Sequence, residues 1–209
     1  MDYLLSEMSL RGWRVKSISV GSMGGITAAK RGECDLAGSH LLDEKTGQYN
    51  VAYLDASLSL EKGYGRKQGF VFRKDDPRFT GKALADAVKA ALSDPACLMI
   101  NRNRGSGTRV LIDGLLGKTR PPGFHVEAKS HNAVAAAVAQ GRADWGIAIE
   151  HVAQGLGLGF LPMKDEEYDF FIPKARVDRP AVKAFLSMLK EPDIRAGLAR
   201  LGMTVRPLA

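Results

Sequence analysis

Nine consecutive residues, Asn101 to Arg109, have the clearest capacity for chemistry. They read Asn-Arg-Asn-Arg-Gly-Ser-Gly-Thr-Arg, between the apolar runs 97–100 and 110–116. This order predicts a strand, a small-residue turn and the start of a helix. Because the first N–H groups of a helix lack intrahelical partners and its dipole is positive there, such a turn can bind a small anion. An equally direct interpretation is an ordinary turn in which Ser106 or Thr108 only caps the helix.

Two other small-residue helix starts offer the same chemistry. One is the turn Ser22-Met23-Gly24-Gly25, and the other is Ser130-His131-Asn132. In α/β sheets of parallel strands, ligands lie beyond the carboxyl ends of the strands, where such turns gather. If the chain forms two facing lobes, we expect all three turns to line the cleft between them and to donate hydrogen bonds to a tetrahedral oxyanion.

Strands alternate with helices along the sequence. Residues 51–60 suit either a strand or a helix, and residues 21–25 suit a turn. The alternation predicts an α/β fold with mostly parallel sheets. By periodicity and capping signals, we expect helices at 2–11, 26–31, 82–92, 133–140, 152–157, 180–189 and 192–201, and strands at 15–20, 34–38, 69–73, 125–128, 144–149, 160–162 and 168–173.

One spacing occurs twice. Gly32 and Asp35 follow Gly21, and Gly141 and Asp144 follow Ser130, at the same intervals. Each unit is a helix with a small-residue start, a glycine stop and an aspartate at the entry to a strand. The echo indicates either two related lobes or two βα units that obey the same physics.

Composition limits the class of protein. The chain has 209 residues, of which 45% are hydrophobic and 25% charged, as in globular proteins. A net charge of +7 suits an anionic partner, but the basic residues are dispersed and only 7% of residues are aromatic, so we expect no direct nucleic-acid contact. Apolar runs are too short for membrane insertion, and residues 1–20 lack a signal-peptide pattern. With Cys34 and Cys97 expected as free thiols, the cytoplasm is the predicted compartment, or the periplasm if a signal peptide was removed.

Other chemistries lack their signatures. The sequence has no phosphate-binding P-loop, and Gly105-Ser106-Gly107 lacks the third glycine of a dinucleotide fingerprint. The four histidines and two cysteines show no metal-ligand spacing. Ser106, His40 and Asp144 are the residue types of a hydrolase triad, but no spacing brings them together. We therefore expect no catalytic residue, no metal and no cofactor.

Three motifs, in order, resemble a known family over nearly the whole chain. They are Gly38-Ser39-His40-Leu41-Leu42-Asp43 with Thr46-Gly47-x-Tyr49-Asn50, then Asn101 to Arg109, then Ser130-His131-x-Ala133-Val134-Ala135-x-Ala137-Val138-x-x-Gly141-Arg142-Ala143-Asp144. They are similar to the periplasmic-binding-protein-like domain of the molybdate-binding type. Such domains stand alone or are fused to helix-turn-helix regulators or molybdopterin-biosynthesis proteins. Arg102 and Ser106-Gly107-Thr108 also match a tungstate-binding motif, whereas residues 103–105 depart from it.

The resemblance implies a type II periplasmic-binding fold with a ligand cleft between two α/β lobes. The expected lobes are residues 1–72 with 166–209, and residues 73–165, with crossover strands near 69–73 and 163–171. The expected ligand-binding residues are Ser22, Met23, Gly24, His40, Arg102, Ser106, Gly107, Thr108, Ser130, His131 and Asn132.

The implied function is non-enzymatic binding of a small oxyanion, with molybdate or tungstate first, by a sensor or a solute-binding domain. A DNA-binding domain or an ABC-transporter permease is the implied partner. The alternative is a regulatory module that binds an organic metabolite or a pterin-like molecule and acts through a partner domain.

Overall fold

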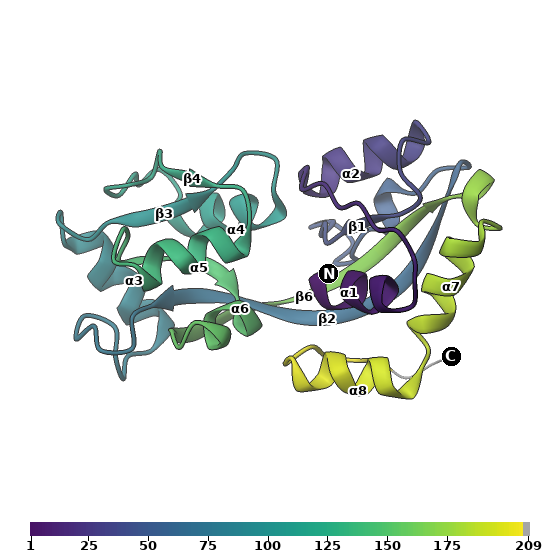
Figure 1. The fold of residues 1–209 in the computed structure, drawn as a ribbon. Coiled ribbons are helices and arrows are strands. Elements are labelled where there is room, and N and C mark those ends of the chain that lie inside the picture. Colours follow the sequence, from purple (N-terminus) through teal and green to yellow (C-terminus); the bar gives the residue numbers. More distant parts are fainter. Residues whose placement is uncertain (207–209) are drawn as a thin grey trace. The chain divides into compact units, whose positions relative to one another are not determined.

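The computed structural model describes residues 1–206, and the chain divides into two compact units. Unit 1 is Met1–Arg66 with Glu166–Ala209, and unit 2 is Lys67–Asp165. The chain passes from unit 1 to unit 2 in the strand β2 (Leu58–Phe72) and returns in β6 (Gly159–Pro173) (Figure 1). The strand order is β1-β6-β2-β5-β3-β4. The lobe boundaries predicted from the sequence stay a prediction.

Unit 2 is built on β3 (Met99–Arg102), which pairs in parallel with both β4 (Glu127–Ala128) and β5 (Trp145–Ile149). Residues Gln68 to Phe72 of β2 pair with β5 in the antiparallel sense. Because successive strand residues face opposite sides, the sheet has two cores. One holds Phe70 and Trp145, whose rings stack at 4.9 Å, and the other holds Val71 and Ile100.

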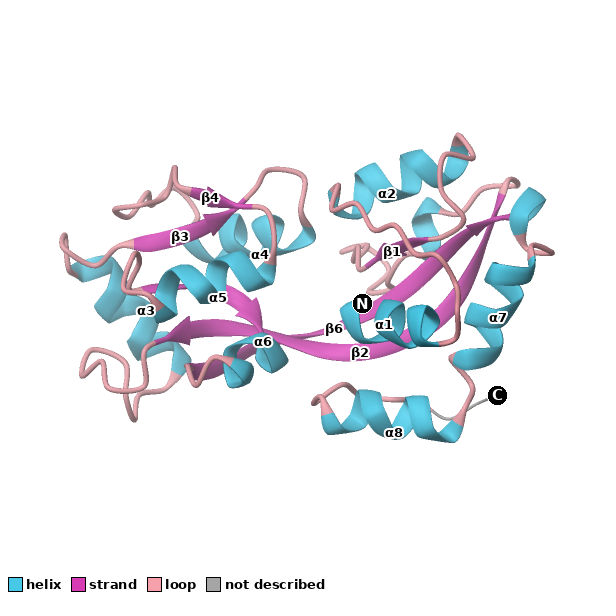
Figure 2. Cartoon of the chain, viewed as in Figure 1, coloured by secondary structure: helices cyan, strands magenta, loops and turns pink. Residues whose placement is uncertain are grey.

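Four helices cover the two faces of the unit 2 sheet (Figure 2). The helices α3 (Leu84–Ser93) and α4 (Gly107–Leu116) pack on the Phe70 face, and α5 (His131–Ala139) and α6 (Glu150–Gly155) pack on the Val71 face. Both α4 and α5 follow a strand of the parallel part of the sheet. Their N-terminal ends therefore lie at its carboxyl edge, where the predicted ligand-binding turns are.

Unit 1 contains the β1 end of the six-stranded sheet. Its edge strand β1 (Ala37–Ser39) pairs with β6 in the antiparallel sense. The helices α1 (Asp2–Leu10), α7 (Pro180–Met188) and α8 (Pro192–Arg200) supply one core together with Phe170. The helix α2 (Gly21–Lys30) packs on the opposite face against Ala37 and Phe171. Two short 3-10 turns, η1 (Val51–Tyr53) and η2 (Lys174–Arg176), complete the unit.

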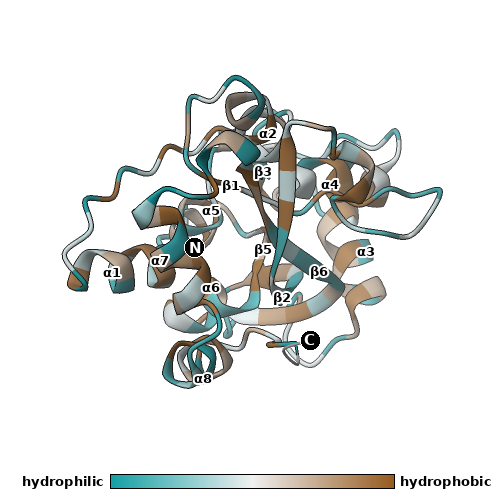
Figure 3. Cartoon of the chain, turned by 90° about the vertical axis from the view of Figure 1, so that its right-hand side faces the viewer, coloured by the Kyte–Doolittle hydropathy of each residue, from teal (hydrophilic) through white to brown (hydrophobic). Residues whose placement is uncertain are grey.

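Buried apolar residues fill four clusters, two in each unit. Figure 3 colours the hydropathy of each residue along the chain, with hydrophobic residues in brown and hydrophilic residues in teal. In residues 1–206, no helix is long and apolar enough to cross a membrane.

The sheet is mixed, so the prediction of mostly parallel sheets was wrong. Two of the pairings are parallel, β3 with β4 and β3 with β5, whereas β1 with β6 and β2 with β5 are antiparallel. The antiparallel pairs involve the two strands that carry the chain between units. These strands lie outside any strand–helix–strand repeat, so the local alternation that predicts parallel pairing does not apply to them.

Three further expectations need correction. Residues 15–20 form no strand, and Ile18 and Val20 are exposed, because a β-rich sequence becomes a strand only where another strand pairs with it. The expected turn at 21–25 is the first part of α2, so that helix begins at Gly21. The expected separate strands at 160–162 and 168–173 are one continuous strand, β6.

Candidate functional site

Arg102 occupies the end of β3 between the starts of two helices in unit 2. Its side chain is buried, with the residue only 6% exposed. Nε donates a hydrogen bond to the Ala128 carbonyl at 3.2 Å. Nη1 lies 3.4 Å from the Thr108 hydroxyl, at the start of α4, and 3.3 Å from Nδ1 of His131, at the start of α5. The guanidinium therefore joins the two helix starts.

The first turn of α4 presents backbone donors beside this guanidinium. Gly105 has a φ of 83°, a conformation that suits glycine, and the chain turns there into the helix. Ser106 is the N-cap: its hydroxyl accepts from the Arg109 N–H at 3.2 Å and donates to the Asn103 carbonyl at 3.0 Å. The N–H groups of Gly107 and Thr108 come next and, by helix geometry, have no intrahelical acceptor. The hydroxyl of Ser106 thus shapes the turn, while that of Thr108 lies against Arg102.

The first turn of α5 repeats this arrangement. Ser130 is the N-cap and its hydroxyl accepts from the Ala133 N–H at 3.1 Å. His131 and Asn132 are the first residues of the helix, so their N–H groups also lack intrahelical acceptors. Two helix dipoles and one guanidinium therefore place positive potential at the same edge of the unit 2 sheet.

The other two arginines of the motif lie elsewhere. Arg109 is buried, and it forms ion pairs with Asp113 at 2.9 Å and Glu127 at 2.7 Å. Its guanidinium also covers the Phe124 ring at 4.8 Å and donates to the Arg102 carbonyl at 3.1 Å. Arg104 is exposed. Arg109 thus links β3 to α4 and β4. Arg102 is the arginine that lies between the two helix starts.

Unit 1 has one small-residue helix start, at α2. Ser22 is buried, and its hydroxyl accepts a hydrogen bond from the His40 N–H at 3.4 Å. This contact places the end of β1 next to the first turn of α2. Met23 is 45% exposed and Gly24 is half-buried, so both lie at the surface of that turn.

Ser39 also belongs to this helix start, although sequence reasoning did not select it. A Cβ built on Gly25 of α2 would lie 3.3 Å from Cβ of Ala37. Since Ser39 is two residues beyond Ala37 in β1, it lies on the same face. Its hydroxyl is fully buried and has no hydrogen-bond partner among the described residues. The sequence could have indicated Ser39, because the two-residue period of a strand places it on the same face as Ala37 in the Gly38-Ser39-His40 motif.

His40 directly follows β1 and lies within a buried charge network. Its Nδ1 contacts Oε1 of Glu166, and Arg66 Nε donates to Oε2 of Glu166 at 2.6 Å. The Tyr168 ring stacks on His40 and lies under the Arg66 guanidinium at 4.6 Å. Burial alone would raise the pKa of Glu166, but Arg66 and His40 outweigh burial and lower it to about 2. Glu166 is therefore ionised at neutral pH, and its carboxylate fixes the position of His40.

The structure thus gathers the predicted residues in two groups. Unit 2 brings seven of them to one edge: Arg102, Ser106, Gly107, Thr108, Ser130, His131 and Asn132. Unit 1 brings together Ser22, Met23, Gly24 and His40. Their role in binding a ligand is a proposal.

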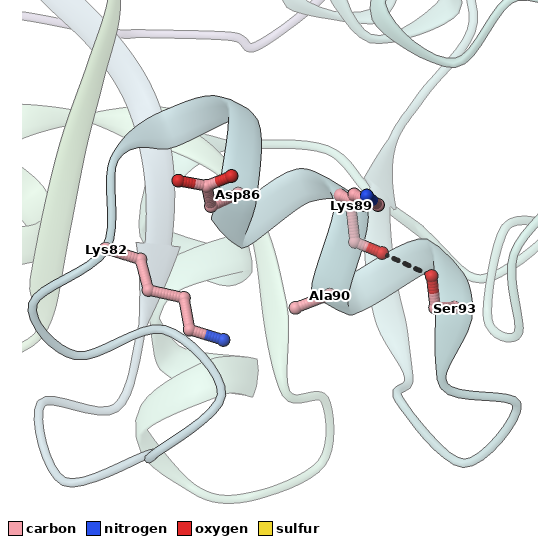
Figure 4. A pocket seen from close by; sticks show the side chains of 5 residues that line it. All are labelled: Lys82, Asp86, Lys89, Ala90 and Ser93. Carbon is pink, nitrogen blue, oxygen red and sulfur yellow. Dashed lines mark hydrogen bonds between the residues drawn. The ribbon is translucent and has the colours of Figure 1, made fainter.

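Other features of the described residues do not offer a site. No cluster of three or more histidine, cysteine or acidic side chains is placed to hold a metal ion within residues 1–206. Burial raises the pKa of the Cys97 thiol to about 12, which disfavours thiolate chemistry. A surface hollow of about 420 Å³ on α3 is lined by Lys82, Asp86, Lys89, Ala90 and Ser93 (Figure 4). It shares no residue with the two helix-start groups.

Comparison with known proteins gives a family and a fold. Residues 5–190 match the PBP superfamily domain. YvgK, an uncharacterized protein of Bacillus subtilis (strain 168), is 33% identical over 211 residues, which are 96% of this chain and 64% of YvgK. The chain therefore spans less than two thirds of that relative.

Two solved structures share the fold at low sequence identity. One is a putative phosphate ABC transporter substrate-binding protein with bound phosphate, from Clostridium perfringens: TM-score 0.66, 12% identity, covering 90% of this chain and 86% of that one. The other is the CcmR regulatory domain of Synechocystis PCC6803 in complex with 2-PG: TM-score 0.63, 16% identity, covering 90% and 88%. The fold is thus found in a transporter substrate-binding protein and in a regulatory domain. With the match covering most of its length, the chain belongs to the PBP superfamily domain family.

Proposed function

We propose that this chain binds a small tetrahedral oxyanion, with molybdate and tungstate as the first candidates, and that it does so as a sensor or solute-binding domain. The proposal concerns the helix-start group of unit 2. The expected contacts are with Arg102, Gly107, Thr108, His131 and Asn132.

The observation that carries the proposal is the position of Arg102. A buried guanidinium lies within 3.4 Å of the first turn of α4 and within 3.3 Å of the first turn of α5. A guanidinium and the positive ends of two helices at one point favour the binding of an anion there. Helix N–H groups then donate to its oxygens, as at other phosphate and sulfate sites.

The two fold neighbours support an anionic ligand. One contains bound phosphate, and the other is in complex with 2-PG. The motif resemblance places molybdate and tungstate ahead of phosphate. Calorimetric titration of the full chain with molybdate, tungstate, sulfate and phosphate tests the proposal. We expect saturable binding of at least one of them, and no heat of binding for all four would overturn it.

A second candidate is an organic anion that acts through a partner domain, and the 2-PG complex of the CcmR domain favours it. Mass spectrometry of ligand carried through purification separates the candidates. A metal oxyanion found by elemental analysis supports the first, and a stoichiometric organic anion supports the second.

We further propose that the chain passes its binding state to another protein or domain. A DNA-binding domain would make it a sensor, and an ABC-transporter permease would make it a receptor. The cytoplasm is the proposed compartment, because Cys34 and Cys97 are both free thiols.

A further inference from the structure

Residues 14–20 connect α1 to α2 in unit 1 without forming a helix or a strand (Figure 1). All of these residues are exposed, and the exposed fractions of Val15, Ile18 and Val20 are 37%, 68% and 53%. Within residues 1–206, no β pairing involves this segment. Exposed β-branched side chains along an unpaired backbone are the features of a segment onto which another strand can add.

The sheet is open at its β1 end, to which this segment leads. In the described part of the chain, β1 is the first strand in the order and pairs only with β6. The helix α2 follows Val20 directly, and a Cβ built on its Gly25 would lie 3.3 Å from Cβ of Ala37 in β1. A strand–helix–strand connection of this kind normally places both of its strands in one sheet. The described residues therefore leave strand pairing open at this end of the sheet.

The side chains of the segment define the chemistry of a complementary strand. Because successive strand residues face opposite sides, residues 14, 16, 18 and 20 share one face when the segment is extended. That face is basic at Arg14 and Lys16 and apolar at Ile18 and Val20, and residues 14–20 include no acidic residue. An antiparallel partner strand complements this face when it carries two apolar residues and then two acidic residues at alternate positions.

We infer that residues 14–20 are a docking surface for an extended segment of another protein, which adds to unit 1 as a β-strand. Its apolar side chains lie opposite Ile18 and Val20, and its acidic side chains lie opposite Arg14 and Lys16. Main-chain hydrogen bonds supply affinity, and the charges set the direction and register of the added strand. The surface shares no residue with the helix-start group of unit 2, so the interaction does not require oxyanion binding.

A synthetic peptide serves as the probe for this surface. In it, threonine alternates first with two valines and then with two glutamates, and a counterpart with lysine in place of both glutamates is the charge control. We expect the full chain to bind the acidic peptide at least ~10-fold more tightly than the lysine peptide, because like charges directly opposite each other are destabilising. Fluorescence anisotropy of labelled peptide measures both affinities. Equal binding of the two peptides, or binding of neither, would overturn the inference.

Hydrogen exchange shows where the peptide binds. The amides of residues 14–20 should exchange rapidly in the free chain, because no strand pairs with them. Saturating acidic peptide should slow their exchange by at least ~10-fold, as main-chain hydrogen bonds form. Peptide binding that leaves the exchange of residues 14–20 unchanged would overturn the inference.

Two exposed apolar residues of unit 1 give a matched pair of variants. Ile18→Asn removes an apolar side chain from the docking face and should weaken binding of the acidic peptide by at least ~10-fold. Leu54→Asn changes a residue that is 37% exposed and lies outside the segment, and it should leave the affinity unchanged. Both side chains are exposed, so we expect both variants to fold. An equal loss in the two variants would remove residues 14–20 from the peptide site.

Two other occupants of the segment would give different results. A second copy of the chain would produce a concentration-dependent dimer in light scattering, and Ile18→Asn would dissociate it. An anionic lipid surface would bind the chain to phosphatidylglycerol vesicles, and Ile18→Asn would weaken that binding. Either result would overturn the assignment to a strand of another protein, whereas a monomer that ignores vesicles and binds the acidic peptide supports it.

Discussion

Thr108 lies in the first turn of α4 and is fully buried, and its hydroxyl contacts the Arg102 guanidinium. Thr108→Val keeps the shape of the side chain and removes the hydroxyl. We expect oxyanion affinity to fall by about 1–3 kcal/mol, the usual cost of leaving a buried charged group short of one hydrogen bond. Calorimetric titration measures this loss. Thr119→Val, at an exposed threonine of unit 2, is the matched control, and an equal loss in both would remove Thr108 from the site.

Glu166 gives unit 1 a pH dependence of stability. Its pKa lies at about 2 in the folded chain, below its ordinary 4.5, because Arg66 and His40 outweigh the opposing effect of burial. A lowered folded pKa stabilises the fold above the unfolded pKa, and this contribution disappears as pH falls from about 4.5 to about 2. Its size is on the order of 3 kcal/mol. Urea unfolding at several pH values should show it.

Glu166→Gln should lose this part of the pH dependence. It should also be less stable at neutral pH, because Arg66 is left buried without its carboxylate. Glu167→Gln, at the more exposed neighbouring residue, is the control and should retain most of the acid dependence of the wild type. A Glu166→Gln variant with the wild-type pH profile would show that the Glu166–Arg66 ion pair does not contribute to the pH dependence of stability.

At the scale of elements, we expect Ser106, the N-cap residue of α4, to stabilise the helix and not to contact the ligand through its hydroxyl. The Ser106 hydroxyl makes both of its hydrogen bonds within the turn, to Asn103 and Arg109. Ser106→Ala should therefore lower the free energy of unfolding by about 0.5–2 kcal/mol, the usual cost of a lost cap. Ser93→Ala, near the end of α3, should change it less. Denaturant unfolding distinguishes the two, and an unaffected Ser106→Ala would mean that the cap does not stabilise α4.

The spacing that occurs twice in the sequence has a counterpart in side-chain contacts. Asp35 accepts from Arg176 and Arg179, both at 2.8 Å, and Asp144 accepts from Arg73 and Arg78, both at 2.8 Å. The preceding glycines end their helices with φ of 67° at Gly32 and 70° at Gly141. Each unit thus closes a helix with a left-handed glycine and fixes the next strand through an aspartate held by two arginines.

Elements with local signals could be predicted from the sequence. Apolar periodicity located α3, the proline starts located α7 and α8, and Ser130 located the cap of α5. Pairing between distant segments could not be predicted, because it depends on which strand lies alongside. The β-rich residues 15–20 therefore form no strand, and β2 and β6 join the sheet in the antiparallel sense. At the candidate site, the motif indicated Arg102, whereas its contact with His131 needed coordinates.

At the scale of the whole molecule, each unit has its own hydrophobic cores. Phe70 and Trp145 belong to cores made of unit 2 residues alone, and Phe170 and Phe185 belong to a core of unit 1 residues. Separate cores allow separate unfolding transitions. We expect the calorimetric enthalpy to exceed the van't Hoff enthalpy in a thermal scan. Equal enthalpies would show that the chain unfolds as one cooperative unit.

A ligand held by unit 2 should stabilise that unit more than the other. Binding to a folded state raises its stability by mass action, so saturating oxyanion should move one transition to higher temperature. Differential scanning calorimetry with and without the best-binding anion measures the shift. Equal movement of all transitions would mean that the anion is held by both units.

The stacking of Trp145 on Phe70 also gives the molecule an optical label. The chain has two tryptophans, and they fall in different units: Trp145 is fully buried in unit 2, whereas Trp13 is half-buried in unit 1. A buried indole emits at shorter wavelength than a hydrated one. Trp13→Phe would leave fluorescence from unit 2 alone, and Trp145→Phe would leave it from unit 1, so that the melting of each unit can be followed in the intact chain without an added dye.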